Sequence, residues 1–234
     1  MWNGQKISLV LPAYNEEPNI AKAVRDFKAL GLIDEILVVD NNSTDATEAE
    51  AKAAGAAVVK ETRQGYGYAI RGGLAAATGD LIAVCEPDGT FRPDDLHKLL
   101  AYAGDFEFVV GSRTSRALLS QDANMGIFLK WGNWSVAKML EFLYNGPSLT
   151  DVGCTYRLIR RDALHKIQGD FRVGANHFSP DMMICAIRRR VKMVEIPVHY
   201  EARIGESKIT GDFVRAFRLG LRMIWLILAR RVGG

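Results

Sequence analysis

The fold is decided by the first strand-like run of the chain and the polar turn after it, Ile7-Ser8-Leu9-Val10-Leu11-Pro12-Ala13-Tyr14-Asn15-Glu16. The apolar part of this run favours a β-strand that stops at the proline. Residues 16–30 then place apolar side chains at the spacing of an amphipathic helix. A second run repeats the strand and its polar end, Ile36-Leu37-Val38-Val39-Asp40-Asn41-Asn42-Ser43.

Strand and helix patterns continue to alternate through the first half of the chain. We expect helices near residues 45–55 and 65–77, and strands at 58–59, 81–85 and 106–110. This alternation predicts βαβ units, and therefore an α/β fold with a mostly parallel sheet. The 234 residues, 48% of them hydrophobic, are enough for one core and too few to require two domains.

The alternation is lost beyond residue 111. There the patterns predict two helices, two strands and a terminal helix, with the helices near 127–143 and 181–190 and the strands near 152–159 and 191–200. We therefore expect one domain, 1–234, whose two halves differ in their local architecture.

Composition excludes several classes of protein. The 30 Lys and Arg against 27 Asp and Glu give a net charge of only +3, which offers no argument for nucleic-acid binding. Three cysteines set apart from one another favour reduced thiols over a disulfide framework. The longest uncharged stretch near the C-terminus, 223–229, is far shorter than a spanning helix, and the N-terminus lacks a signal-like pattern. We expect a cytoplasmic protein.

Polar clusters follow three of the expected strands. The first holds Tyr14 and Glu16, the second holds Asp40 and Asn42, and the third is Glu86-Pro87-Asp88. Ligands of parallel α/β sheets bind outside the carboxyl ends of the strands, so the three clusters are expected to converge on one cleft.

Glu86 and Asp88 are candidate metal ligands. Two carboxylates on one tight turn can hold a hard cation such as Mg²⁺ or Mn²⁺ and leave positions for diphosphate oxygens. Such a metal would stabilise the charge of a departing nucleoside diphosphate. The alternative is a solvated acidic turn in which Asp88 caps the next helix.

Several motifs in the same order, from about residue 6 to residue 210, resemble glycosyltransferase family 2, particularly its dolichol-phosphate mannose synthase-like branch. They are the two strand ends quoted above, Gly79-Asp80, Glu86-Pro87-Asp88-Gly89-Thr90 and Gly205-Glu206-Ser207-Lys208. The resemblance implies a GT-A fold, a nucleotide-diphosphate sugar donor (a GDP- or UDP-sugar), a divalent metal, inversion at the anomeric carbon and often a polyprenyl phosphate acceptor.

The resemblance also implies roles for residues of the first half. Pro12, Tyr14 and Glu16 match the first nucleotide-binding strand end, and Asp40, followed by Asn42, matches the acid that contacts the base or ribose. Asp88 matches the principal metal aspartate, while Glu86 stands where the family more often has Asp. Gly65 and Gly67, in Arg63-Gln64-Gly65-Tyr66-Gly67, look like the glycine-rich donor loop. Without the resemblance, that loop would read as a flexible entry to a helix.

On the acceptor side, Arg113 resembles the arginine that this branch places against the acceptor phosphate, and Lys130 stands near a second basic position. Asp151 matches a retained family aspartate that could orient the acceptor. Asp181 lies near the catalytic carboxylate of members that use hydroxyl acceptors, or else is a favourable charge at a helix N-terminus. A segment that resembles a loop closing over the phosphates contributes Arg203, Ser207 and Lys208.

We accordingly divide the domain into a nucleotide-sugar and metal half (6–110), an acceptor half (111–210) and a C-terminal amphipathic helix (211–234). That helix places Arg215, Arg218 and Arg222 on one face, among apolar residues. It could lie on a membrane surface through residues 211–231, pack on the core or form a homodimer. The four histidines show no metal-ligand spacing and are expected to be structural or exposed.

Three functions remain open at this point. The leading one is a synthase of polyprenyl-phosphate sugars at the cytoplasmic face of a membrane. A family 2 transferase acting on a saccharide hydroxyl would need a carboxylate base such as Asp151 or Asp181. A non-catalytic nucleotide-sugar binding protein would need no catalytic base. A nucleotidyltransferase is disfavoured because the early glycine-rich loop with a basic residue is missing.

Overall fold

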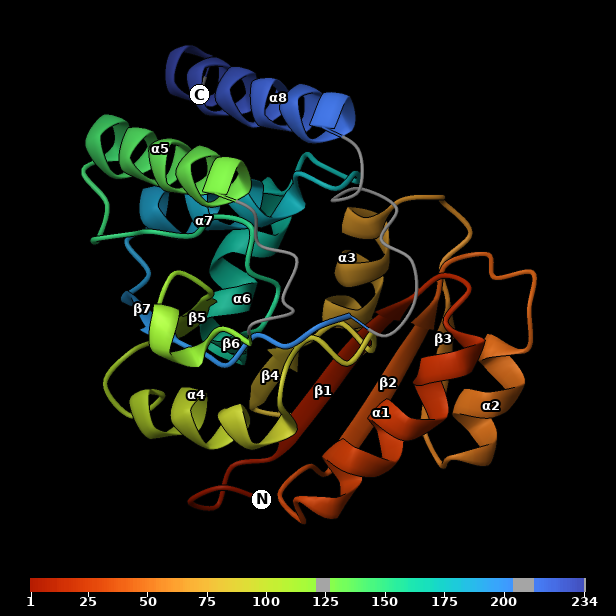
Figure 1. Cartoon of the computed structure of the whole chain (residues 1–234). Coiled ribbons are helices and arrows are strands. Elements are labelled where there is room, and N and C mark those ends of the chain that lie inside the picture. The colour runs from red at the N-terminus through yellow and green to blue at the C-terminus, as the bar shows by residue number, and fades with distance from the viewer. Residues whose placement is uncertain (121–126, 204–212, 234) are drawn as a thin grey trace.

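A computed structural model describes residues 1–120, 127–203 and 213–233, and they form a seven-stranded sheet flanked by helices (Figure 1). The strand order is β3-β2-β1-β4-β6-β5-β7, and β6 alone runs opposite to its neighbours. The strands are β1 (Ile7–Ala13), β2 (Glu35–Asp40), β3 (Ala57–Lys60), β4 (Leu81–Val84), β5 (Phe108–Ser112), β6 (Arg157–Arg160) and β7 (Met193–Pro197). The predicted α/β fold with a mostly parallel sheet is confirmed.

The helices cover both faces of the sheet. They are α1 (Glu17–Ala29), α2 (Thr47–Ala53), α3 (Tyr66–Ala76), α4 (Leu96–Tyr102), α5 (Ile127–Tyr144), α6 (Arg161–Ile167), α7 (Phe178–Arg188) and α8 (Phe213–Val232). Apolar side chains of α1, α2 and α4 share one core with the sheet. Those of α3, α5, α6, α7 and α8 form the second core on the opposite face. More helices therefore pack on the face of the sheet that α3 covers than on the face that α1 covers.

The reversed strand β6 brings a later segment to the carboxyl edge of the sheet. The sequence pattern places a strand at 152–159, whereas the ladder begins at Arg157, which pairs with Val84 at the end of β4. Because β6 is antiparallel to β4, its first residues lie where β4 ends. The segment before β6 consequently brings Thr155 to Glu86, a neighbour that the sequence pattern could not supply.

Helix α8 is anchored by a buried ion pair with α7. Arg230 donates from Nε and Nη2 to Oδ1 of Asp181 at 3.1 and 2.5 Å, and Nη2 also donates to the Asp170 carbonyl. The other Asp181 oxygen accepts the backbone N–H groups of Arg172 and Val173 at 2.9 and 3.0 Å. Asp181 is fully buried. Its carboxylate therefore serves the packing of α8, and of the two interpretations made from sequence the structural one fits.

Two adjacent glycines of α3 differ in what surrounds them. A Cβ at Gly73 would stand 2.8 Å from Cγ2 of Val39 and closer still to Val10, because α3 packs directly on β1 and β2. A Cβ at Gly72 would meet nothing nearer than 3.4 Å. Close helix-to-strand approach thus requires glycine at position 73 but not at position 72.

We predict opposite effects for the two alanine substitutions. Gly73→Ala should lower the free energy of unfolding by about 1–3 kcal/mol through overpacking. Gly72→Ala should leave it unchanged or raise it by up to about 1 kcal/mol, since alanine favours the helix. Urea unfolding of both variants beside the parent chain tests the pair. Equal effects would contradict this account of the α3 packing.

Candidate active site

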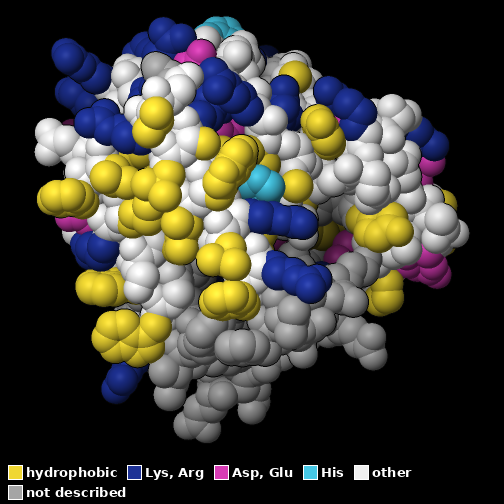
Figure 2. Space-filling view, turned by 90° about the horizontal axis from the view of Figure 1, so that it is seen from above, with side chains coloured by type: hydrophobic (Ala, Val, Ile, Leu, Met, Phe, Trp, Pro, Cys, Tyr) yellow, Lys and Arg dark blue, Asp and Glu magenta, His cyan; other side chains and the backbone are white. Residues whose placement is uncertain are grey.

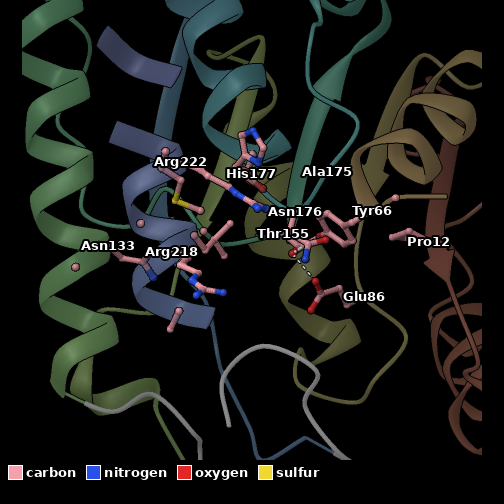
Figure 3. Close-up of a pocket in the computed structure, with 18 of the residues that line it drawn as sticks. Pro12, Tyr66, Glu86, Asn133, Thr155, Ala175, Asn176, His177, Arg218 and Arg222 are labelled. Carbon is pink, nitrogen blue, oxygen red and sulfur yellow. Dashed lines mark hydrogen bonds between the residues drawn. The ribbon is translucent and has the colours of Figure 1, made fainter. Parts of the chain in front are cut away.

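One cavity of about 910 Å³ runs over the carboxyl edge of the sheet and under α8. Its wall begins at the end of β1 and reaches α5, the start of α7 and one face of α8 (Figure 3). The predicted site residues on this wall are Pro12, Tyr14, Glu16, Gly65, Glu86, Asp88, Arg113 and Arg203. The expected convergence of strand ends on one cleft is thus what the structure shows for β1 and β4.

Glu86 and Asp88 project from the turn that follows β4. Asp88 is buried, and its Oδ1 accepts hydrogen bonds from the backbone N–H and the hydroxyl of Thr90 at 3.0 and 2.6 Å. Oε1 of Glu86 accepts from the hydroxyl of Thr155 at 3.0 Å, which in turn accepts from the Tyr66 hydroxyl at 2.6 Å. Both carboxylates are therefore oriented by uncharged hydrogen-bond donors, which do not neutralise the negative charge of the carboxylates.

The electrostatics of this pair are unfavourable without a cation. Burial raises the pKa of Glu86, and the negative charge of Asp88 raises it further. The Arg113 charge acts on Glu86 in the opposite direction. A second guanidinium, that of Arg203, stands beside the pair, with Nη1 at 3.4 Å from Oδ2 of Asp88 and Nη2 at 3.1 Å from Oε1 of Glu16. Arg203 thus links the ends of β1 and β4 across the cavity.

The residues present fit a divalent metal held jointly with a substrate. No cluster of three or more His, Cys, Asp or Glu side chains occurs within the described residues, so the protein offers two carboxylates rather than a closed cage. Mg²⁺ is commonly bound in this way, by one or two carboxylates plus phosphate oxygens and water. Glu86 and Asp88 would be the ligands.

The end of β2 contributes a different residue from those predicted. The described wall of the cavity includes Asn41 but neither Asp40 nor Asn42. Asn41 is buried, donates to the carbonyls of Glu61 and Arg63 at 2.8 Å, and accepts from the Gly65 N–H at 2.8 Å. It therefore holds the loop before α3 against the cavity.

Asp40 and Asn42 hold the turn after β2. Oδ1 of Asp40 accepts from the Ser43 N–H at 3.0 Å, and Asn42 donates to the Thr62 carbonyl at 2.9 Å. Neither side chain is on the described wall of the cavity, and the nucleotide-binding roles expected for Asp40 and Asn42 from the sequence stay predictions.

Gly65 and Gly67 have different roles. Gly65 lines the cavity, whereas Gly67 is buried behind it. A Cβ at Gly67 would stand 2.8 Å from both the Gly174 carbonyl carbon and Cβ of Phe178. Position 67 is therefore glycine because α3 packs closely on the segment before α7, and its assignment to donor binding is not supported by its position.

Arg113 and Asp151 form a bidentate pair. Nε and Nη2 of Arg113 donate to the two carboxylate oxygens at 2.8 and 2.9 Å, and the N–H groups of Arg113 and Gly153 complete the set at 3.1 and 3.0 Å. Burial disfavours the Asp151 carboxylate, but the Arg113 charge and these bonds outweigh it and hold the pKa of Asp151 below its ordinary value. Asp151 is fully buried, so it positions Arg113, which lines the cavity.

Several residues of the cavity wall were not anticipated. They are Tyr66, Asn133, Thr155, Asn176 and His177, together with Arg218 and Arg222, whose helix face had been expected to meet a membrane or protein. His177 in particular was expected to be structural or exposed. The four-residue spacing of the two arginines was the one available signal, and it could not say which way their face points.

The remaining predicted residues either are not on the cavity wall or lie outside the described residues. Lys130 is described but is not on the wall of the cavity. Ser207 and Lys208 lie outside the described residues, as does the side chain of Arg215.

Comparison with known proteins places this geometry in a family. Residues 8–168 match the family described as Glycosyl transferase family 2. The low-salt glycan biosynthesis hexosyltransferase Agl6 of Haloferax volcanii is 30% identical over 209 residues, which are 87% of this chain and 49% of Agl6, so the chain spans about half of that relative. The dolichyl-phosphate hexose transferase of the same organism is 26% identical over 97% of this chain and 96% of its own length.

A solved structure has the same fold. Glucosyl-3-phosphoglycerate synthase from Mycobacterium tuberculosis, in complex with Mn²⁺, uridine diphosphate and glucosyl-3-phosphoglycerate, superposes with a TM-score of 0.73 at 21% identity, over 98% of this chain and 81% of that one. This likeness concerns the fold alone. Together with the match over residues 8–168, the shared arrangement of sheet and helices leads to one conclusion: the chain belongs to glycosyltransferase family 2 and is a glycosyltransferase with a GT-A fold.

Proposed function

We propose that this glycosyltransferase transfers a sugar, with inversion, from a nucleotide-diphosphate sugar to a polyprenyl phosphate, in a reaction that depends on Mg²⁺ or Mn²⁺. The observation that carries the proposal is a cavity with a carboxylate pair at one end and, at the other, a helix that presents both arginines and apolar side chains. The first end suits a metal and a diphosphate. The second suits an anionic group attached to an apolar chain.

The donor is assigned to the carboxylate end. A metal held by Glu86 and Asp88 would offset the negative charge of the departing nucleoside diphosphate, whether a GDP- or UDP-sugar is used. Arg203, already within reach of both Glu16 and Asp88, adds a permanent positive charge at the same place. Asn41 and Gly65 form the adjoining wall, where the nucleotide would lie.

The acceptor is assigned from the absence of a free base among the predicted carboxylates. Asp151 is engaged by Arg113, and Asp181 by Arg230. Two other carboxylates of the described wall also have cationic neighbours: Glu16 pairs with Arg203, and Glu201 lies 3.9 Å from Arg92. A sugar hydroxyl must lose a proton, whereas a phosphate is already anionic near neutral pH. A phosphate acceptor therefore fits this wall better.

The bond changes are then simple. An acceptor phosphate oxygen forms the new bond to the anomeric carbon, and the bond from that carbon to the donor phosphate oxygen breaks. Its electron pair leaves with the nucleoside diphosphate, and no proton needs to move. The protein contributes positioning and stabilisation of the developing charge.

An apolar surface adjoins the acceptor end. Phe217, Leu221 and Ile224 of α8 lie on the cavity wall. Large hydrophobic side chains are exposed on α5 and α8, namely Trp131, Trp134, Phe142, Phe217, Leu221, Trp225 and Leu228. Viewed from the side where α5 and α8 lie, hydrophobic side chains gather among Lys and Arg (Figure 2). This pattern suits peripheral contact with the cytoplasmic face of a membrane. No described helix is long and apolar enough to span a bilayer.

Transfer of radiolabelled sugar tests the proposal. The full chain is incubated with a panel of GDP- and UDP-sugars, Mg²⁺ or Mn²⁺, and polyprenyl phosphate, and the organic-extractable label is counted. We expect lipid label that chelator removes and that Asp88→Asn lowers at least a hundredfold, because a metal ligand is lost. Label that enters only saccharide hydroxyls would overturn the acceptor assignment.

Glu86→Gln should separate stability from metal binding. The folded protein raises the pKa of Glu86 above 4.5, so its ionised form is disfavoured on folding and weakens the metal-free fold above that pKa. We expect Glu86→Gln to raise the unfolding free energy of the metal-free chain by roughly 1 kcal/mol at pH 7.5. The rise in Tm on adding Mn²⁺ should shrink or vanish.

The control for this measurement is Glu50→Gln on the exposed surface of α2. It should change neither quantity. A Glu86→Gln chain that is less stable without metal, or equally stabilised by Mn²⁺, would contradict the assigned role.

Asp151→Asn should destabilise the fold, because the Arg113 side chain, which is only 13% exposed, would lose its counter-charge. We expect the free energy of unfolding at pH 7 to fall by about 3–5 kcal/mol, as for other broken buried pairs. The folded pKa of Asp151 is lowered from 3.8, so the pair contributes stability above that pH and loses it as the pH falls through the lower folded value.

Urea unfolding at pH 7 and at pH 3 measures both effects, and the gap between parent and variant should narrow at the acidic pH. A variant of parental stability that has lost only its turnover would instead identify Asp151 as a catalytic base.

A further inference from the structure

Three basic side chains gather at the end of the cavity that lies opposite the carboxylates. Arg218 and Arg222 come from α8, and His177 immediately precedes α7. In Figure 3 the two arginines extend from α8 toward the interior of the cavity, with Pro12 on the opposite side and Thr155 and Glu86 between. These side chains stand on the acceptor side of the cavity but belong to no motif by which the family was recognised.

The two α8 arginines differ from the other arginines of the wall in having no counter-charge. Arg113 is paired with Asp151, and Arg203 with Glu16 and Asp88. Within the part of the chain that the structure describes, Arg218 and Arg222 make no ion pair or hydrogen bond, although both lie on the wall. Their donors are therefore available to a ligand.

The spacing of these arginines suits one anion. Residues four apart lie on the same face of a helix, so two positive charges are held about one turn from each other, at some cost from mutual repulsion. A phosphate between them removes that repulsion and can accept from both guanidinium groups. Arg113 suits the same task less well, because its Nε and Nη2 already donate to Asp151.

His177 and two amides complete the surroundings. Nδ1 of His177 is buried without a hydrogen-bond partner among the described atoms. Burial and the neighbouring charge of Arg222 lower the pKa of His177, so the ring is neutral near pH 7 and can donate from one nitrogen. Asn133 of α5 and Asn176 line the same region. The subsite thus offers charged and neutral donors together.

We propose that Arg218, Arg222 and His177 form the subsite that binds the phosphate of a polyprenyl phosphate acceptor, with the apolar chain leaving past Phe217, Leu221 and Ile224. This inference rests on the proposed function and adds which residues select the acceptor. The phosphate enters beneath α8, and its free oxygen faces along the cavity toward Arg113 and the donor end. Helix α8 is then a specificity element as well as a packing element.

Binding of geranylgeranyl phosphate to the full chain, measured calorimetrically, tests this subsite. Geranylgeraniol reports the chain alone, and inorganic phosphate reports the anion alone. Variants are Arg218→Gln, Arg222→Gln, the double variant and His177→Gln. The matched control is Arg25→Gln, an exposed arginine of α1 that lies off the cavity and has no described partner. Binding of UDP with Mn²⁺ is measured in parallel.

We expect each arginine variant to weaken geranylgeranyl phosphate about tenfold and the double variant to approach the affinity of geranylgeraniol. His177→Gln should weaken it less. Arg25→Gln should bind like the parent, and the nucleotide should bind all variants equally, because its end of the cavity is unchanged. Thermal unfolding confirms that each variant is folded.

Three results would overturn the proposal in distinguishable ways. If the double variant binds the lipid phosphate within twofold of the parent, Arg218 and Arg222 do not form the subsite. The proposed function would not be affected by that result. If inorganic phosphate binds as tightly as the lipid, with the same dependence on the arginines, the ligand of the subsite is a small phosphate ester rather than a polyprenyl phosphate. A parent chain that binds neither phosphate removes the subsite altogether, and the transfer assay then decides separately whether the proposed acceptor survives.

Discussion

Two carboxylates, Glu86 and Asp88, stand at the end of a fully buried strand, and the rest of the site is arranged around their negative charge. Burying charge without compensation is costly. Here the neighbours are of two kinds. Neutral donors, Thr90 and Thr155, orient the oxygens, and the Arg203 guanidinium stands beside Asp88. The arrangement leaves a negative charge that a divalent metal can offset while the metal also binds the oxygens of a diphosphate.

Arginine is used in three distinct ways in this protein. Arg113 and Arg230 each saturate a fully buried carboxylate and thereby fix a loop or a helix. Arg157 is buried and forms no ion pair with a carboxylate in the part of the chain that the structure describes. It donates instead to the carbonyls of Cys154 and Thr155, which holds Thr155 beside Glu86. Arg218 and Arg222 have no described partner at all. A charge that the fold does not neutralise is the one left for a ligand.

Helix α8 connects these uses, because one end of it is anchored and the other forms part of the cavity. Arg230 fixes its last turns to Asp181, and Tyr144 of α5 donates to the Ile227 carbonyl at 2.8 Å. The earlier turns then present Arg218 and Arg222 over the cavity, while other side chains of the helix remain exposed. In the function that we propose, the same element would contact a lipid surface and bind the phosphate of the acceptor.

The sequence by itself determined the α/β class of the fold and singled out the two carboxylates that we propose as metal ligands. Strand and helix periodicity located β1 to β5 and α1 to α3 closely, since these patterns depend on local burial. Local motifs likewise led to Glu86 and Asp88, because both lie on one turn. The ladder reversal at β6, which brings Thr155 to Glu86, could not be read locally, because strand pairing joins residues far apart in the chain.

Tertiary structure alone decided how the remaining charged residues are used. In the sequence, Asp151 and Asp181 were candidate bases and Arg218 and Arg222 belonged to a surface helix. Packing gives each aspartate its own arginine and turns the other two arginines over the cavity. The role of a charged side chain depends on the partner that it contacts in the folded protein. The partners of Asp151 and Asp181 lie 38 and 49 residues away along the chain, so local spacing does not reveal them.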